Sequence, residues 1–586
     1  MSKINNMNYK NEYERWLTDP SIDESTHREL QGISDNEKEI EDRFYTYLAF
    51  GTAGMRGVIG AGTNRMNIYT VRKATQGMAN YILAQGTGQK GVVIAYDCRR
   101  MSPEFCEEAA LVLNGNGIPT YIFESLRPTP ELSFAVKHLG CTAGIVITAS
   151  HNPPEYNGYK VYWDDGGQVP YPRDHDIIGE VNKITDFAQI KVINKDKAVK
   201  AGLFCIAGPE VDAAYYQAVL KERRCPEMAG SQLKIVFTPL HGTGNIPVRQ
   251  ILAEAGYKNL YVVEEQAEPD GNFPTVPSPN PEDYKVFALA EEIARKEDAD
   301  IMLCTDPDAD RMGVAVRLEK GKYIPFTGNM AGVLLTEYIL SQDKAKGRLP
   351  SPADKGVVIS TIVSTNMTRA IAEYYGCTYM EVLTGFKYFG EKIKGFEATG
   401  SNKYIFGFEE SYGCLAGDYA RDKDAVLAIL LLCEAAAFYA REGKTLWDVL
   451  VDIYKKYGYY KEHVESITLK GIEGLADIHR IMTGLREKPP KEIGGITLTQ
   501  RRDYEAGKIT DCITGSSKDT GLPASDVLYY VLEDGSWVCI RPSGTEPKIK
   551  LYFGTLVTEY SHVEEADKKA NEKITAMAEA MRSKLL

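Results

Sequence analysis

The chain lacks paired cysteines, a long apolar run and an excess of basic residues. Its 11 cysteines among 586 residues form no Cys-x-x-Cys pair and show no metal-ligand spacing. Neither a disulfide scaffold nor a zinc site is therefore predicted, and we expect free thiols in the reducing cytoplasm. The opening MSKINNMNYKNEYERW contains no apolar segment of the kind that a secretory signal requires.

The apolar and charged residues exclude two further classes of protein. The longest apolar stretch, residues 425–440, contains Glu434 and is shorter than the roughly 20 residues of a membrane span. We predict a buried core helix there and no membrane partner. With 68 Lys and Arg against 81 Asp and Glu, the net charge is −13, which argues against nucleic-acid binding. A local basic pocket can still bind an anionic substrate.

One pattern of apolar runs and polar loops occurs three times, in residues 91–154, 233–311 and 356–413. Each copy begins with an apolar, β-branched run, passes through a helical stretch and ends with an apolar run followed by an unusual polar loop. This pattern predicts βαβ units on mainly parallel sheets, where ligands bind beyond the carboxyl ends of the strands. Alternatively, the three segments share only the strand–helix units common to all α/β proteins.

The length predicts three to five domains, at about 100–200 residues per domain. We predict an α/β fold with mixed sheets in three related domains and a smaller α+β domain at the end, in which Asp534-Gly535 marks an antiparallel hairpin. The first 45 or so residues are predicted to form a helical extension packed on the first domain. The predicted domains span residues 1–205, 206–326, 327–460 and 461–586.

A group of three aspartates follows the apolar run IMLC, in the segment Thr305 to Arg311. Asp306, Asp308 and Asp310 occupy alternate positions. Packed together, their carboxylates would raise one another's pKa, and a divalent cation with oxygen ligands removes that cost. The segment lacks the glycine and the distal glutamate of an EF-hand. It predicts a metal site, with a solvated acidic turn as the alternative.

A serine follows another apolar run, in Thr148-Ala149-Ser150-His151-Asn152-Pro153-Pro154. No Gly-x-Ser-x-Gly turn surrounds Ser150, so a Ser–His–Asp hydrolase is disfavoured. Downstream, Lys160 returns a cation toward the loop. A serine near a metal loop and a lysine suits a phosphorylated serine better than an acyl-enzyme. Spacing alone leaves a capping loop equally open.

Three weaker motifs carry polar groups suited to a sugar phosphate. GFEES, with Glu409, offers acceptors for sugar hydroxyls, although it also fits an acidic turn. The segment from Arg541 to Lys548 combines a guanidinium, hydroxyls and a glycine, which can hold a phosphate or connect two strands. The segment FGTAGMRG is a glycine-rich loop with Arg56.

The five motifs FGTAGMRG, TASHNPP, DPDADR, GFEES and RPSGTEP occur in this order and resemble those of the α-D-phosphohexomutase superfamily. The match runs from about residue 45 to the end. Within the superfamily the chain is similar to the phosphoglucomutase branch, which includes animal phosphopentomutases and glucose-1,6-bisphosphate synthases. The resemblance implies four domains around a central cleft, three with an α/β core and a smaller α+β fourth.

The resemblance also implies roles for individual residues. Ser150 is the phosphoserine, and Mg²⁺ is held by Asp306, Asp308, Asp310 and a phosphate oxygen on Ser150. Residues expected around the transferring phosphoryl group are Arg56, His151, Lys160 and Arg311, of which Arg56 and Lys160 are candidates for proton transfer. Residues expected to hold the sugar are Thr384, Lys387, Glu409, Ser411 and Lys423. Residues expected to hold the distal phosphate are Arg541, Ser543, Gly544 and Thr545.

The implied activity is the interconversion of glucose 1-phosphate and glucose 6-phosphate through a glucose 1,6-bisphosphate intermediate, which also serves as activator. The alternatives are a preference for mannose or pentose phosphates, or synthesis of glucose 1,6-bisphosphate. A phosphatase and a non-catalytic sugar-phosphate sensor are two further classes. The implied substrate is a sugar monophosphate, and the sequence leaves monomer and dimer open.

Overall fold

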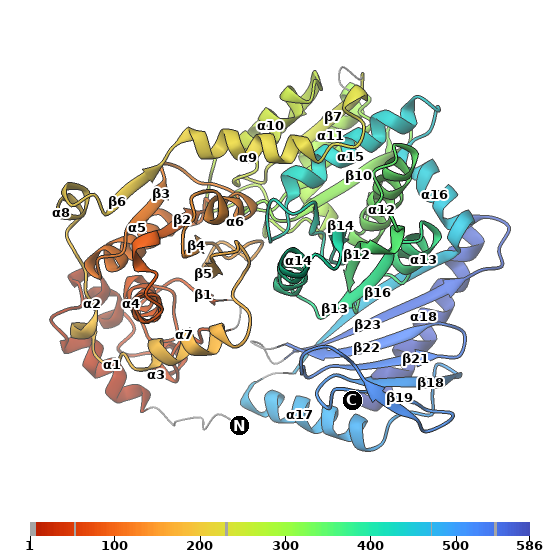
Figure 1. Cartoon of the computed structure of the whole chain (residues 1–586). Helices are drawn as coiled ribbons and strands as arrows, with labels where there is room; N and C mark the ends of the chain where they lie inside the picture. The colour runs from red at the N-terminus through yellow and green to blue at the C-terminus, as the bar shows by residue number, and fades with distance from the viewer. Residues whose placement is uncertain (1–7, 52–53, 229–231, 470, 544–547, 586) are drawn as a thin grey trace. The chain divides into compact units, whose positions relative to one another are not determined.

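The computed structural model of the chain describes residues 8–51, 54–228, 232–469, 471–543 and 548–585 (Figure 1). These residues form two compact units. Unit 1 comprises residues 1–328 and 386–445, and unit 2 comprises residues 329–385 and 446–586. The third predicted domain, residues 327–460, therefore contributes to both units.

The first sheet of unit 1 has six strands in the order β1-β5-β4-β2-β3-β6. Four strands are parallel to one another: β2 (Val92–Tyr96), β3 (Thr120–Phe123), β4 (Ala143–Ile147) and β6 (Phe204–Ala207). Two are antiparallel to their neighbours: β1 (Met55–Val58) and β5 (Tyr156–Trp163). The sheet is therefore mixed, as predicted, and its carboxyl edge presents the loops that follow β2 and β4.

Helices cover both faces of this sheet. On one face, Ile145 and Ile147 of β4 pack with Phe105 of α5 (Ser102–Gly115) and with α4 (Ile68–Ala84). On the other, Val146 packs with Leu132 of α6 (Thr129–His138). Side chains alternate along a strand, so β4 is apolar throughout because both of its faces are buried.

The segment before the first sheet forms three short helices, α1 (Tyr9–Thr18), α2 (Glu24–Gln31) and α3 (Glu37–Phe44). Their apolar side chains form one cluster in which Trp16 and Phe44 meet Tyr69 of α4. The expected helical extension on the first domain is confirmed.

The second sheet of unit 1 has the strand order β11-β10-β9-β7-β8. Its parallel strands are β7 (Lys234–Thr238), β8 (Asn259–Val262) and β9 (Ile301–Thr305). Its antiparallel strands are β10 (Met312–Glu319) and β11 (Lys322–Phe326). The buried β9 leads directly into the aspartate loop.

The second segment of unit 1, residues 386–445, contains α14 (Lys387–Thr399), the antiparallel pair β14 (Lys403–Phe408) and β15 (Cys414–Ala416), and α15 (Ala425–Ala440). The predicted core helix is confirmed, because α15 is buried over nearly its whole length. Its Glu434 accepts hydrogen bonds from Arg224 N (2.7 Å) and Arg223 Nε (3.2 Å). Among the described residues, no helix has the length and apolarity needed to cross a membrane.

Unit 2 begins with α12 (Gly328–Ala345), whose first residue belongs to unit 1, and continues with the parallel pair β12 (Gly356–Thr361) and β13 (Thr378–Val382), α13 (Met367–Tyr374) and α16 (Leu446–Tyr457). An antiparallel sheet then runs in the order β16-β23-β22-β21-β18-β19-β20. Its strands include β16 (Tyr459–Thr468), β18 (Ile496–Asp503), β19 (Lys508–Asp511), β20 (Ser517–Asp519) and β23 (Lys548–Val557). The predicted hairpin joins β21 (Leu528–Leu532) to β22 (Trp537–Pro542), with Gly535 at φ +84°. Both α17 (Gly471–Glu487) and α18 (Val563–Leu585) contribute buried residues to the core of this sheet.

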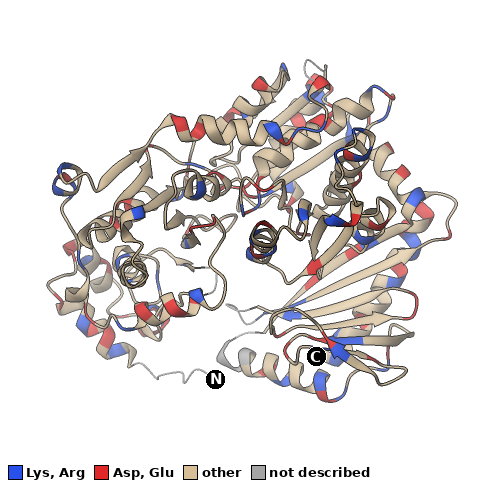
Figure 2. Cartoon of the chain, viewed as in Figure 1, with Lys and Arg blue, Asp and Glu red and all other residues tan. Residues whose placement is uncertain are grey.

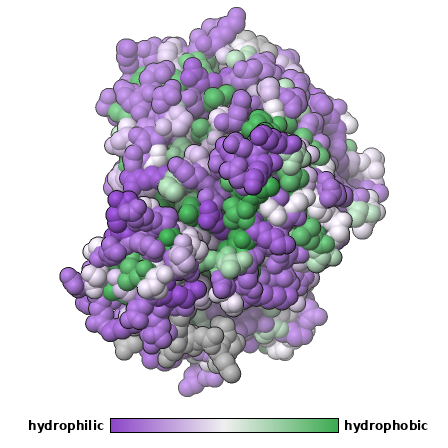
Figure 3. Space-filling model, turned by 90° about the vertical axis from the view of Figure 1, so that its left-hand side faces the viewer, coloured by the Kyte–Doolittle hydropathy of each residue, from purple (hydrophilic) through white to green (hydrophobic). Residues whose placement is uncertain are grey.

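Charged residues of both signs are interspersed along the helices and strand ends (Figure 2). The face drawn in Figure 3 is mostly hydrophilic, with apolar side chains in small groups.

Candidate active site

Ser150 lies in the loop that follows β4, and its backbone has φ +53°. This left-handed conformation is uncommon outside glycine and costs a residue with a side chain roughly 1–2 kcal/mol. Thr148 Oγ1 accepts a hydrogen bond from Ser150 N at 2.8 Å. The serine is only 3% exposed, so the loop presents its hydroxyl inside the protein.

The Ser150 hydroxyl has two close partners. Its Oγ donates to Asp306 Oδ2 at 2.8 Å and lies 3.1 Å from His151 Nδ1. Burial, followed by the positive charges of Arg311 and Arg56, lowers the pKa of His151 to about 2. The imidazole is therefore neutral beside the serine.

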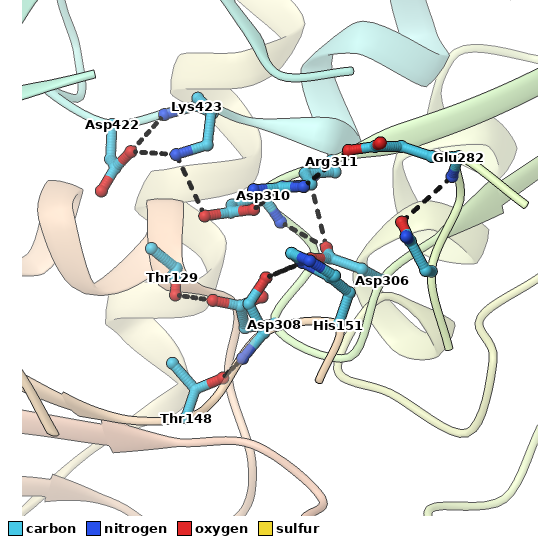
Figure 4. A network of polar contacts seen from close by, with 12 residues as sticks. Thr129, Thr148, His151, Glu282, Asp306, Asp308, Asp310, Arg311, Asp422 and Lys423 are labelled. Carbon is cyan, nitrogen blue, oxygen red and sulfur yellow. Dashed lines mark hydrogen bonds and ion pairs between the residues drawn. The ribbon is translucent and has the colours of Figure 1, made fainter. Parts of the chain in front are cut away.

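The three aspartates come together in the turn after β9 (Figure 4). Asp306 Oδ1 accepts hydrogen bonds from the backbone N–H groups of Asp310 and Arg311, both at 3.1 Å. Ala309 lies in the left-handed region at φ +50°, which lets the chain fold back over Asp306. One carboxylate oxygen from each aspartate lies within 4.8 Å of the other two.

All three carboxyl groups are buried, and their pKa values diverge. Burial, and then the charges of Asp308 and Asp310, raise the pKa of Asp306 well above its usual range. Burial also acts to raise the pKa of Asp308, but the Lys160 ammonium outweighs it and holds this pKa below its usual range. The pKa of Asp310 is lowered too, because Lys423 and Lys160 offset burial and the charge of Asp308.

Lys160 projects from β5 into this group of carboxylates. Its Nζ donates to Asp308 Oδ2 at 2.7 Å and lies 3.5 Å from Asp310 Oδ2. Burial acts against its charge, but Asp308 and Asp310 raise its pKa above the usual value. Lys160, which was predicted to approach the Ser150 loop, thus contacts the aspartates.

A second lysine approaches from the loop before α15. Lys423 Nζ lies 3.0 Å from Asp422 Oδ1 and 3.2 Å from Asp310 Oδ2, and 5.5 Å from the ring centroid of Phe386. Burial disfavours its charge, but Asp310, Asp422 and Glu409 raise its pKa. Lys423 therefore lies close to both Phe386 and the aspartate group, all within unit 1.

Two arginines belong to the same region. Arg311 NH1 donates to Glu282 Oε1 at 3.1 Å (Figure 4), and its partly buried guanidinium has a raised pKa, because nearby carboxylates, Asp310 first, outweigh burial. Arg56, on β1, is exposed and donates from NH1 to Asn152 Oδ1 at 3.0 Å. Arg56 thus places a cation against Asn152 of the Ser150 loop.

The predicted sugar-binding residues fall into two groups. Glu409 follows β14 and is 5% exposed, and Ser411 is partly buried two residues later. Lys387 begins α14, and burial lowers its pKa. These three lie in unit 1 with the aspartates, whereas Thr384 lies in unit 2.

The predicted phosphate loop follows β22 in unit 2. Arg541 is partly buried at the end of that strand, and Ser543 N donates to Lys548 O at 2.7 Å. Gly544 and Thr545 lie outside the described residues.

The structure adds two residues that the sequence did not indicate. Thr129, the first residue of α6, donates from Oγ1 to Asp308 Oδ2 at 2.8 Å. Arg99, after β2, donates to backbone carbonyls of the Ser150 loop. Thr129 and Asp308 are 179 positions apart, and no local pattern connects them.

The donor atoms fit a divalent cation. Asp308 Oδ1 and Asp310 Oδ1 are buried and accept no hydrogen bond among the described residues. Three carboxylates so close together cannot all ionise without nearby positive charge. An all-oxygen donor set suits Mg²⁺ or Ca²⁺. The predicted metal group is therefore present as a buried cluster that could hold a metal.

Family models match four successive segments of the chain. They are described as phosphoglucomutase/phosphomannomutase α/β/α domains I, II and III and C-terminal domain, and match residues 47–188, 213–320, 327–457 and 501–576. The chain belongs to the phosphoglucomutase/phosphomannomutase family. The predicted superfamily and fold class, three α/β domains followed by a C-terminal domain, are confirmed. The central cleft stays a prediction.

Relatives of known name agree with this membership. The chain is 38% identical to a phosphoglucomutase of Staphylococcus epidermidis over 531 residues, covering 91% of this chain and 94% of that protein. It is 38% identical to one from Staphylococcus aureus over 532 residues, covering 90% and 94%.

Two solved structures of family members share the fold. A putative phosphomannomutase from Thermus thermophilus has a TM-score of 0.65 at 22% identity, covering 90% of this chain and 99% of that chain. Parafusin, a phosphoglucomutase from Paramecium in an open form, has a TM-score of 0.66 at 16% identity, covering 91% and 95%.

Proposed function

We propose that this protein is a phosphoglucomutase that interconverts glucose 1-phosphate and glucose 6-phosphate, with Ser150 as the phosphate carrier. Membership of the family makes it a phosphohexomutase of the isomerase class, as the resemblance implied. The observation that carries the proposal is the buried contact of 2.8 Å between Ser150 Oγ and Asp306 Oδ2. It supports a phosphoserine whose phosphate borders a cation site.

We assign Asp306, Asp308 and Asp310 as ligands of one Mg²⁺, together with a phosphate oxygen on Ser150. When bound, the ion would neutralise charge on the transferring phosphoryl group. Asp308 Oδ1 and Asp310 Oδ1, which accept no hydrogen bond among the described residues, support this assignment. Thr129 and Lys160, which contact Asp308, would orient that ligand.

In the first half-reaction, a hydroxyl of the sugar monophosphate attacks the phosphorus of phosphorylated Ser150. The bond from phosphorus to Ser150 Oγ breaks, a bond to the sugar oxygen forms, and the sugar hydroxyl loses its proton. Phosphoryl transfer depends mainly on positioning and charge stabilisation. Arg56, His151, Lys160 and Arg311 would supply both, with Arg56 and Lys160 as candidates to handle the proton.

In the second half-reaction the bisphosphate presents its other phosphate to Ser150, which takes it back, and the isomeric monophosphate leaves. This requires a sugar that turns over between the two steps. Thr384, Lys387, Glu409, Ser411 and Lys423 would hold its hydroxyls. The segment containing Arg541, Ser543, Gly544 and Thr545 would hold the phosphate that is not reacting.

Two further points of the proposal concern setting and activation. The eleven cysteines are all free thiols, which supports a reducing cytoplasm. Glucose 1,6-bisphosphate would serve as activator, because it can phosphorylate Ser150 of the resting enzyme.

A substrate panel tests the proposal. Glucose, mannose, ribose and deoxyribose 1-phosphates are compared with Mg²⁺ and a trace of the matching bisphosphate, and formation of the isomer is measured by a coupled assay. The highest kcat/KM is expected with glucose 1-phosphate. A higher value with mannose or a pentose would reassign the sugar. Release of inorganic phosphate without an isomer would indicate a phosphatase.

A further inference from the structure

Arg99 is a buried cation directly behind the Ser150 loop. It follows β2, and its side chain has 0% exposed surface. Its Nε lies 3.4 Å from Asp97 Oδ2, and Asp97 Oδ1 accepts from Arg99 N (3.0 Å) and Ser102 Oγ (2.8 Å). A buried charge is costly unless it is paired, and Asp97 supplies that pairing.

The rest of the guanidinium is used by one short segment of backbone. NH1 donates to the carbonyl oxygens of Pro153 (2.9 Å) and Tyr156 (3.1 Å). NH2 donates to the carbonyl oxygens of Ser150 (2.5 Å) and Asn152. NH1 and NH2 together have four N–H bonds, so one side chain holds four carbonyls within seven residues.

Among residues 150–153, only the carbonyl of His151 is not bound by Arg99, and it has a partner of its own. His151 O accepts from Ser278 Oγ at 2.7 Å. The carbonyls of four consecutive residues, 150–153, are therefore held by only two side chains. This explains how Ser150 keeps its left-handed backbone, because such strain persists where the surroundings fix it.

We propose that Arg99 is a positioning residue that holds the Ser150 loop, and so the phosphate carrier, in register with the aspartate loop. The inference rests on the proposed function of Ser150 and deepens it. Arg99 contacts no reacting atom. It acts through the backbone carbonyl of Ser150, whose Oγ contacts Asp306.

Lysine cannot replace this arrangement fully. Its ammonium is a single point with three donors, whereas the planar guanidinium fork reaches four carbonyls and Asp97. A small displacement of the carrier oxygen is costly, since an error of about 1 Å can reduce a rate about 100-fold. We therefore expect Arg99→Lys to lower kcat about 10–100-fold and to leave KM for glucose 1-phosphate within about twofold.

The test compares Arg99→Lys and Ser278→Ala with the neighbouring Arg100→Lys. Arg100 is exposed and bonds Asn272 Oδ1 at 2.7 Å, so it is a matched control. Two readouts are measured with Mg²⁺: the split between kcat and KM, and hydrogen exchange of the backbone amides in residues 148–157. In Arg99→Lys, exchange should become faster in this segment, together with the fall in kcat. Ser278→Ala should produce the same changes more weakly, and Arg100→Lys neither.

The inference is overturned if folded Arg99→Lys keeps the kcat and the exchange pattern of the wild type. It is also overturned if its exchange rises evenly across the first sheet, since that is a general loss of stability. If Arg99→Lys does not fold, Ser278→Ala decides between the same outcomes. Hydrogen exchange can be measured without turnover. It therefore tests whether Arg99 holds the loop even if the wild-type protein proves to have no mutase activity.

Discussion

Ser150 Oγ and Asp306 Oδ2 share a buried hydrogen bond of 2.8 Å although the residues are 156 positions apart. Each follows a buried strand of its own sheet, β4 for Ser150 and β9 for Asp306. A phosphate on Ser150 would displace this bond and bring negative charge beside a carboxyl whose pKa is already raised by burial and by Asp308 and Asp310. Phosphorylation of Ser150 must therefore be coupled to cation binding at the aspartates.

The first prediction concerns metal affinity. Phosphorylated Ser150 adds a charged oxygen ligand to the aspartates, so Mg²⁺ should bind at least about tenfold more tightly to the phosphoprotein. Titration calorimetry on phosphorylated and phosphatase-treated protein measures this, with Ser150→Ala as the control that phosphorylation cannot change. Equal affinities of the two forms would contradict the assignment of Ser150 as a metal neighbour.

The second prediction concerns Lys160. Lys160→Met leaves Asp308 buried without its cation, and the free energy of unfolding in EDTA should fall by about 3–5 kcal/mol. Saturating Mg²⁺ should narrow the gap to the wild type, because it supplies the missing positive charge. Denaturant unfolding with and without the metal measures both effects. Lys183→Met, at a side chain 70% exposed, should change stability by less than about 0.5 kcal/mol.

The third prediction concerns Thr129, which donates to Asp308 at 2.8 Å. Thr129→Val removes the hydroxyl at nearly constant volume and should cost about 1 kcal/mol, that is, about fivefold in Mg²⁺ affinity. Thr129→Ser keeps the donor and should restore most of the affinity. If the valine and serine variants bind Mg²⁺ equally well, the hydrogen bond does not orient Asp308.

The fourth prediction is a pH dependence in unit 2. Glu462 on β16 (Tyr459–Thr468) is partly exposed and accepts from Asn329 Nδ2 at 3.1 Å. Burial raises its pKa from 4.5 to about 7, and hydrogen bonds from Thr365 and Asn329 limit the rise. Between pH 4.5 and pH 7, Glu462 therefore keeps its proton in the folded state but has lost it in the unfolded chain. The stability from this proton is full below pH 4.5 and is lost as pH rises through 7.

Glu462→Gln is neutral at every pH and should remove this dependence. Its advantage over the wild type should grow between pH 4.5 and 8, to at most about 3 kcal/mol. Hydrogen exchange of the β16 amides at several pH values measures it. Glu492→Gln, at an exposed residue of the same unit, is the control. Parallel pH curves for wild type and Glu462→Gln would exclude a raised pKa of Glu462 in the folded protein.

Much of the fold followed from local patterns. The buried helix at residues 425–440, the hairpin at Gly535 and the helical start are each set by apolar periodicity or turn chemistry, and the structure has all three. Ser150 and Asp306 were found because an apolar strand leading into a polar loop is visible in sequence.

The side chains that hold these loops in place could not be predicted from the sequence. Arg99 and Arg100 are adjacent in the run DCRR, and the sequence does not indicate which of the two side chains is buried. Its role depends on carbonyls more than 50 positions away. Lys160 was identified, but its partner was not: it reaches Asp308 across two sheets, a contact that only the tertiary fold creates.

Transfer of labelled phosphate through Ser150 tests the central claim most directly. The enzyme is incubated with glucose 1,6-bisphosphate carrying labelled phosphate, freed of ligand and then given unlabelled glucose 1-phosphate. We expect the label on the peptide containing Ser150 and then, at a rate matching kcat, in the sugar phosphates, with neither step in Ser150→Ala. Turnover at the wild-type rate in Ser150→Ala, or label that never reaches this peptide, would contradict the account.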